Sequence, residues 1–188
     1  MENRCGASPA DRKLLSKAAY GKVRNFGADV GNLRVSSSAV ELDLLLDTKD
    51  RLQESLKALE SQIGPLLTIR KLDVPSPPIA KQEAISLGLD LFNQERYWES
   101  HEALESAWKI ATGDEKEILQ GLILVAAALV HWQKNEKQVA LSVIKRAQDK
   151  LESHGTEYCG INLARLSGRL GTMLDAGKPE FFKLNARL

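Results

Sequence analysis

The chain has 188 residues, of which 43% are hydrophobic and 27% are charged, and this composition is that of a folded globular protein rather than a disordered one. Its 26 basic and 25 acidic residues nearly cancel, so no net field attracts nucleic acid or an anionic membrane. No apolar run reaches the length of a membrane span, and the two distant cysteines, Cys5 and Cys159, indicate free thiols in a reducing compartment. We expect a soluble cytoplasmic protein with no membrane partner, and nucleic acid is a disfavoured partner.

In the first 74 residues, some segments have apolar residues at helical spacing and others have the alternation typical of strands. Ser8-Pro9-Ala10-Asp11 predicts a helix start, with a serine cap and proline at the first helical position. The expected elements are a helix to residue 23, strands at 30–35 and 40–46, a helix at 48–63 and a strand at 66–72. This order predicts an α+β domain, ferredoxin-like but lacking its first strand. Either residues 1–5 pair weakly with the open sheet edge or the natural start lies upstream, and the edge favours a homodimer.

A proline-rich linker is predicted at residues 75–78, because Pro75, Pro77 and Pro78 interrupt both helix and strand. The second domain, residues 79–188, has helical spacing throughout. Helices are expected at 79–93, 96–110, 114–134, 136–153 and 161–176. The third is apolar around nearly its whole circumference, which predicts a buried central helix in an all-α antiparallel bundle.

One face of the second of these helices combines aromatic and ionisable side chains. His101, Glu105 and Trp108 share a narrow arc of the helix, and Trp98 lies beside it. Gln120 and His131 share a stripe of the buried third helix, and we expect the two stripes to meet. The candidate polar cluster consists of Trp98, Glu99, His101, Glu102, Glu105, Trp108, Gln120 and His131.

Three interpretations of this cluster are open. It is a structural hydrogen-bond network, or a small-ligand pocket in which Glu105 polarises His101 and Gln120 orients the ligand, or a transition-metal site at His101, Glu105 and His131. The zincin spacing fails because position 105, where that motif needs a second histidine, is glutamate. We therefore predict no cofactor, and whether the protein is an enzyme stays open.

These residues also form a family pattern. The run Trp-Glu-x-His-Glu-x-x-Glu-x-x-Trp from Trp98 to Trp108, followed by Gln120-Gly121 and His131, resembles the domain of unknown function 309 family over about residues 79–153. The resemblance implies a small helical bundle found in prokaryotes, with no established activity. The residues that match it are Trp98, Glu99, His101, Glu102, Glu105, Trp108, Gln120, Gly121 and His131.

A helical interaction or scaffold module is the alternative function. Antiparallel helical hairpins favour it, although no 34-residue repeat supports a tetratricopeptide array. Basic residues near both ends of the chain weakly indicate nucleic acid, with Phe181 and Phe182 as stacking groups. The favoured interpretation is that these two rings pack the C-terminus onto the bundle.

Overall fold

The computed structural model describes residues 1–72 and 79–184, and the chain divides into two compact units. The first unit, here called N-terminal, comprises residues 1–75 together with 133–135, and the helical unit comprises residues 76–132 and 136–188. The predicted linker at 75–78 lies outside the described residues. No helix among the described residues is long and apolar enough to cross a membrane.

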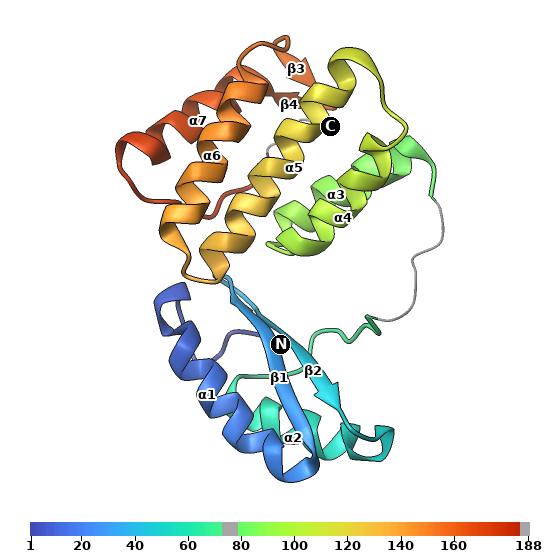
Figure 1. The fold of residues 1–188 in the computed structure, drawn as a ribbon, viewed down its shortest axis with the longest axis vertical. Helices are drawn as coiled ribbons and strands as arrows, with labels where there is room; N and C mark the ends of the chain where they lie inside the picture. Colours follow the sequence, from blue (N-terminus) through green and yellow to red (C-terminus); the bar gives the residue numbers. More distant parts are fainter. Residues whose placement is uncertain (73–78, 185–188) are drawn as a thin grey trace. The chain divides into compact units, whose positions relative to one another are not determined.

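The N-terminal unit combines two helices with a two-stranded sheet (Figure 1). Its elements are a 3-10 turn η1 (Pro9–Asp11), α1 (Arg12–Val23), η2 (Arg24–Phe26), β1 (Ala28–Val35), β2 (Val40–Leu46), η3 (Lys49–Arg51) and α2 (Leu52–Gln62). The strands are antiparallel, with Val35 opposite Val40, and their register shifts between Gly31 and Arg34. The predicted α+β class and the order helix, strand, strand, helix are confirmed.

The first helix begins where the Ser8–Asp11 pattern places it. The Asp11 carboxylate accepts hydrogen bonds from the Ser8 hydroxyl at 2.7 Å and from the Ser8 amide at 2.9 Å. These bonds lower the pKa of Asp11 from its ordinary value. The core of the unit then joins both helices to the sheet, through Leu15, Ala19, Val23, Ala28, Leu33, Val35, Val40, Leu59 and Ile63.

The strand expected at residues 66–72 is wrong, because this segment forms neither helix nor strand. Leu67 and Ile69 are 60% and 58% exposed, so their alternation with polar neighbours buries no face. The start of the chain occupies the edge of β2 instead. Glu2 bridges to Ala39, and the amide of Val40 donates to the Met1 carbonyl at 2.8 Å. The expected weak pairing of the first residues with the sheet edge is therefore observed.

The described residues of the helical unit form five helices that begin and end within two residues of the predicted positions. They are α3 (Lys81–Asn93), α4 (Tyr97–Trp108), α5 (Gly113–Gln133), α6 (Lys137–Leu151) and α7 (Leu163–Asp175). A short hairpin of β3 (Glu157–Tyr158) and β4 (Ile161–Asn162), which the sequence did not predict, connects α6 to α7. Buried residues recur along α5 on most of its sides, including Leu119, Leu122 and Leu129, which confirms the buried central helix.

Two glycines allow helices to cross closely. A methyl group at Gly88 of α3 would lie 2.6 Å from the Leu104 side chain of α4, and one at Gly121 of α5 would lie 2.6 Å from Leu151 of α6. The buried Ser100 hydroxyl of α4 donates to the Gly88 carbonyl at 2.8 Å. The close approach of α4 to α3, and of α6 to α5, therefore depends on having glycine, which has no side chain, at these two positions.

The C-terminal segment packs onto the helical unit, as the favoured interpretation of Phe181 and Phe182 requires. The Phe182 ring meets Phe92 edge-on at 5.3 Å, and Phe181 stacks with Tyr97 at 5.9 Å. Asn93 exchanges two hydrogen bonds with the backbone of Leu184. The two phenylalanines are therefore part of the bundle and do not form an exposed stacking surface.

Candidate functional site

Trp98 and His101 form an aromatic pair on the outer side of α4. They are three residues apart on one helix, so their side chains lie on the same face. Their ring centroids are 5.8 Å apart and the rings are nearly parallel, at 9°. Trp98 is 40% exposed, whereas the Nδ1 atom of His101 is buried and has no hydrogen-bond partner among the described residues. The half-buried imidazole thus supports an indole that solvent reaches.

Glu99 has a local structural role at the start of α4. Its carboxylate makes two hydrogen bonds of 2.6 Å with the guanidinium of Arg96, the residue before the helix. This two-bond geometry is the strong form of an arginine–carboxylate pair. A carboxylate in the first turn also interacts favourably with the positive end of the helix dipole. Glu99 therefore stabilises the α3–α4 turn.

Trp108, at the other end of α4, is bound into the bundle. It packs against the hydrophobic core, and the Lys116 ammonium of α5 lies 4.5 Å from the centroid of its ring. This geometry is a cation–π contact that joins α4 to α5. The buried indole Nε1 has no hydrogen-bond partner among the described residues.

His131 and Gln120 have separate surroundings on α5. His131 Nδ1 lies 2.5 Å from Glu136 Oε2, and the Glu136 amide donates to the His131 carbonyl at 2.9 Å, so this pair links α5 to the start of α6. Eleven residues separate Gln120 from His131, which is about 16 Å along a helix. The two residues therefore lie on different turns of α5, and the meeting of the two stripes stays a prediction.

The metal hypothesis gains no support from side-chain geometry. Within residues 1–72 and 79–184, no group of three or more His, Cys, Asp or Glu side chains is arranged to hold a metal ion. The predicted ligands His101, Glu105 and His131 do not form such a group.

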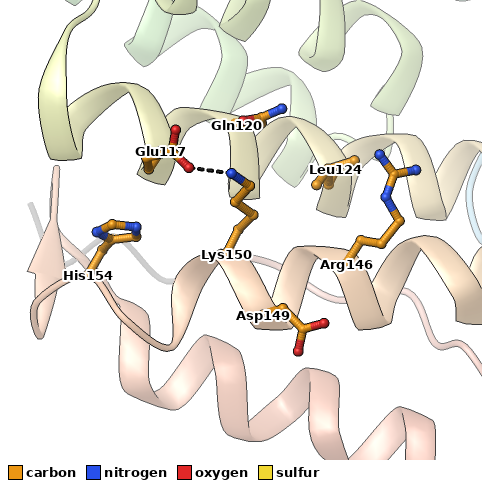
Figure 2. A pocket seen from close by; sticks show the side chains of 7 residues that line it. All are labelled: Glu117, Gln120, Leu124, Arg146, Asp149, Lys150 and His154. Atoms are coloured by element: carbon orange, nitrogen blue, oxygen red, sulfur yellow. Dashed lines mark hydrogen bonds and ion pairs between the residues drawn. The ribbon is translucent and has the colours of Figure 1, made fainter.

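A second candidate site is an open pocket of about 410 Å³ between α5 and α6 (Figure 2). It is lined by Glu117, Gln120 and Leu124 of α5, by Arg146, Asp149 and Lys150 of α6, and by His154 beyond the end of α6. The Lys150 ammonium bonds to the Glu117 carboxylate across the two helices and holds the pKa of Glu117 below its ordinary value.

Of these lining residues, the sequence analysis singled out Gln120 for this kind of role but not Arg146, Lys150 or Glu117. Charged residues on a helix usually face solvent, so nothing in the sequences of α5 and α6 distinguishes these three residues from a solvated face. The lysine–glutamate pair joins positions 33 residues apart. No local pattern contains that information.

Comparison with known proteins relates part of the helical unit to a protein family. The model described as "Domain of unknown function (DUF309)" matches residues 85–143. Residues 85–143 of the helical unit are therefore similar to this family. The match lies within α3 to α6 and includes all eight residues of the predicted cluster, which confirms the resemblance seen in the sequence. No curated protein and no solved structure matches the chain.

The structure divides the residues of the DUF309 pattern into two groups. Glu99, Trp108, Gly121 and His131 each have a structural contact described above, and Gln120 lines the α5–α6 pocket. The remaining four, Trp98, His101, Glu102 and Glu105, lie together on α4, and we call them the α4 face. Helical spacing places Trp98, Glu102 and Glu105 on successive turns of one side.

The α4 face lies in an acidic part of the chain. From the start of α3 to the end of α4, residues 81–108, there are six acidic and two basic residues, which gives a net charge of −4. Both of these basic residues have carboxylate partners, Lys81 with Glu115 and Arg96 with Glu99. The α3–α4 segment that carries the exposed indole therefore has an excess of negative charge.

Proposed function

We propose that the helical unit of this chain is a binding module whose α4 face takes an arginine- or lysine-rich segment of a partner protein. The observation that carries the proposal is the 40% exposed Trp98 held parallel to His101 and followed by Glu102 and Glu105. An interaction module is the alternative that the sequence left open, and the chemistry of this face favours it.

The face combines two ways of binding a cation. Tryptophan is the best of the aromatic rings for a cation–π contact, and carboxylates on the next two turns add charge-assisted hydrogen bonds. Stacking on His101 fixes the indole in advance, which lowers the entropy lost when a partner binds. Rigid tryptophans of this kind are typical hot spots of protein interfaces.

Catalysis by this group has less support. A general base of the predicted kind needs Glu105 to hold one ring nitrogen of His101 while the other accepts a proton. The buried Nδ1 of His101 makes no hydrogen bond with any described residue, and the ring is engaged by Trp98. Binding therefore fits the imidazole better than proton transfer.

The test uses the full chain and a rhodamine-labelled hexa-arginine peptide, with binding followed by fluorescence anisotropy. Removal of the indole in Trp98→Ala should weaken binding about 2- to 30-fold, the range that a cation–π contact supplies, and Trp98→Phe should lose less. Glu105→Gln removes one negative charge from the face. Glu180→Gln removes the same charge from an exposed position outside α3 and α4.

Glu105→Gln should weaken peptide binding and Glu180→Gln should leave it nearly unchanged, while far-UV circular dichroism checks that each variant is folded. Equal losses in the two glutamine variants would show that only net charge matters. Full affinity in Trp98→Ala would refute the proposed role of the indole. Absence of peptide binding by the parent chain would refute the function itself.

We also propose a cytoplasmic setting for this interaction. Cys5 and Cys159 are both free thiols, which fits a reducing compartment.

A further inference from the structure

We infer that the α5–α6 pocket is a binding site for a small organic anion, separate from the α4 face. The pocket has about 410 Å³ of space, within the range of small-molecule sites. It is built where Gly121 lets Leu151 approach α5, and the side chains of Arg146 and Lys150 extend from α6 toward α5 (Figure 2).

Both carboxylates that line the pocket are already neutralised by lysines. Lys150 bonds to Glu117, and Lys145 donates to Asp149 at 2.6 Å. Figure 2 shows the Asp149 carboxylate directed away from α5. Neither carboxylate therefore presents an uncompensated charge that would repel an incoming anion.

Arg146 keeps its full charge available. Among the described residues, no hydrogen bond or ion pair engages its guanidinium, which is exposed and lies beside Leu124 in Figure 2. A guanidinium presents a planar fork of N–H donors that matches a carboxylate or a phosphate. The charge of the pocket thus selects an oxyanion.

The other lining groups define the rest of the ligand. Leu124 offers an apolar surface between Arg146 and Gln120, and the Gln120 amide has no partner among the described residues. An amide both donates and accepts hydrogen bonds. The ligand that fits has an oxyanion on Arg146 and a small apolar body over Leu124, and it reaches Gln120 with a polar group.

Phenyl phosphate is a suitable probe, because it joins an oxyanion to an apolar ring of the required size. Titration of the full chain by calorimetry should give one saturable site with a dissociation constant of about 1 mM, as expected for a ligand of this size. Arg146→Gln should weaken binding about 10- to 100-fold, the range for a lost charged hydrogen-bond pair. Benzoate in a parallel titration compares the carboxylate with the phosphate.

Arg165→Gln is the matched control, since Arg165 is an exposed arginine on α7 outside the pocket and the substitution changes the net charge equally. It should change the dissociation constant less than 2-fold. An equal loss in both variants would reduce the effect to net charge and overturn the site. Undiminished binding of phenyl phosphate by Arg146→Gln would also overturn the site. The same holds if the parent chain binds neither phenyl phosphate nor benzoate.

Inorganic phosphate and phenol separate the two parts of the ligand. Each should bind more weakly than phenyl phosphate, because each lacks either the ring or the charge. Inorganic phosphate that bound as tightly as phenyl phosphate would overturn the assignment to an organic anion. Arg146→Gln should also keep the affinity for hexa-arginine, so failure of this site and failure of the α4 face are distinguishable.

Discussion

Gly121→Ala tests the helix crossing on which the α5–α6 pocket depends. The added methyl carbon would lie 2.6 Å from Leu151 Cδ2 and 2.7 Å from Cγ, far inside van der Waals contact. Leu151 is 1% exposed, so its side chain cannot move into solvent. Overpacking of this kind costs about 1–3 kcal/mol, and the better helix propensity of alanine recovers about 0.5–1 kcal/mol. We expect a net destabilisation of about 1–2 kcal/mol.

The assay is urea unfolding of the full chain followed by tryptophan fluorescence. All three tryptophans, Trp98, Trp108 and Trp132, belong to the helical unit, so the fluorescence signal comes from residues of this unit. Gly168→Ala on α7 is the matched control, because a methyl group there meets no atom within 4 Å. It should stabilise the unit by about 0.5–1 kcal/mol.

Changes of opposite sign in the free energy of unfolding of the two variants would confirm that the crossing of α5 and α6 requires glycine at position 121. If Gly121→Ala raised the urea midpoint as Gly168→Ala does, the close approach of α5 and α6 would be wrong. The double variant Gly121→Ala/Leu151→Ala adds a further check, since the clash disappears with the leucine side chain. Additive effects of the two substitutions would contradict direct contact between them.

Two further predictions concern the helical unit. Ser100→Ala deletes the buried hydrogen bond to the Gly88 carbonyl and should lower the free energy of unfolding by about 1 kcal/mol, measured by the same urea assay; an unchanged midpoint would refute it. Because Lys150 lowers the pKa of Glu117 in the folded state, the stability that this pair contributes is present above the ordinary value of 4.5 and is lost as the pH falls through the folded value. The difference in urea midpoint between the parent and Lys150→Gln should therefore narrow from pH 6 to pH 3.5, and a difference independent of pH would contradict this linkage.

Local signals were enough for the helices. The apolar positions that repeat every three or four residues, together with breaks such as Asn135, predicted the five helices described in the helical unit to within two residues. The same holds for residues 40–46, where alternation predicted β2 with its observed bounds. These patterns are local because helical rotation and strand pleating are properties of a few consecutive residues.

Alternation failed at residues 66–72 because a strand also needs a partner. Leu67 and Ile69 have the right spacing, but the Pro65 carbonyl accepts a hydrogen bond from the Glu2 amide, and the first residues pair with the start of β2. Pairing depends on contacts between distant parts of the chain. The local pattern contains no information on which segment reaches the sheet edge.

The same contrast between local sequence patterns and contacts of distant residues applies to the candidate sites. The sequence by itself determined that Trp98 and His101 share one side of α4, since residues three apart on a helix are neighbours. Only the tertiary structure decided that His131 contacts Glu136 and that Gln120 lines a pocket with Arg146. The side of a helix on which a residue lies follows from the fixed rotation per residue. Which other helix packs against that side depends on close packing between distant residues, here of Leu151 against Gly121.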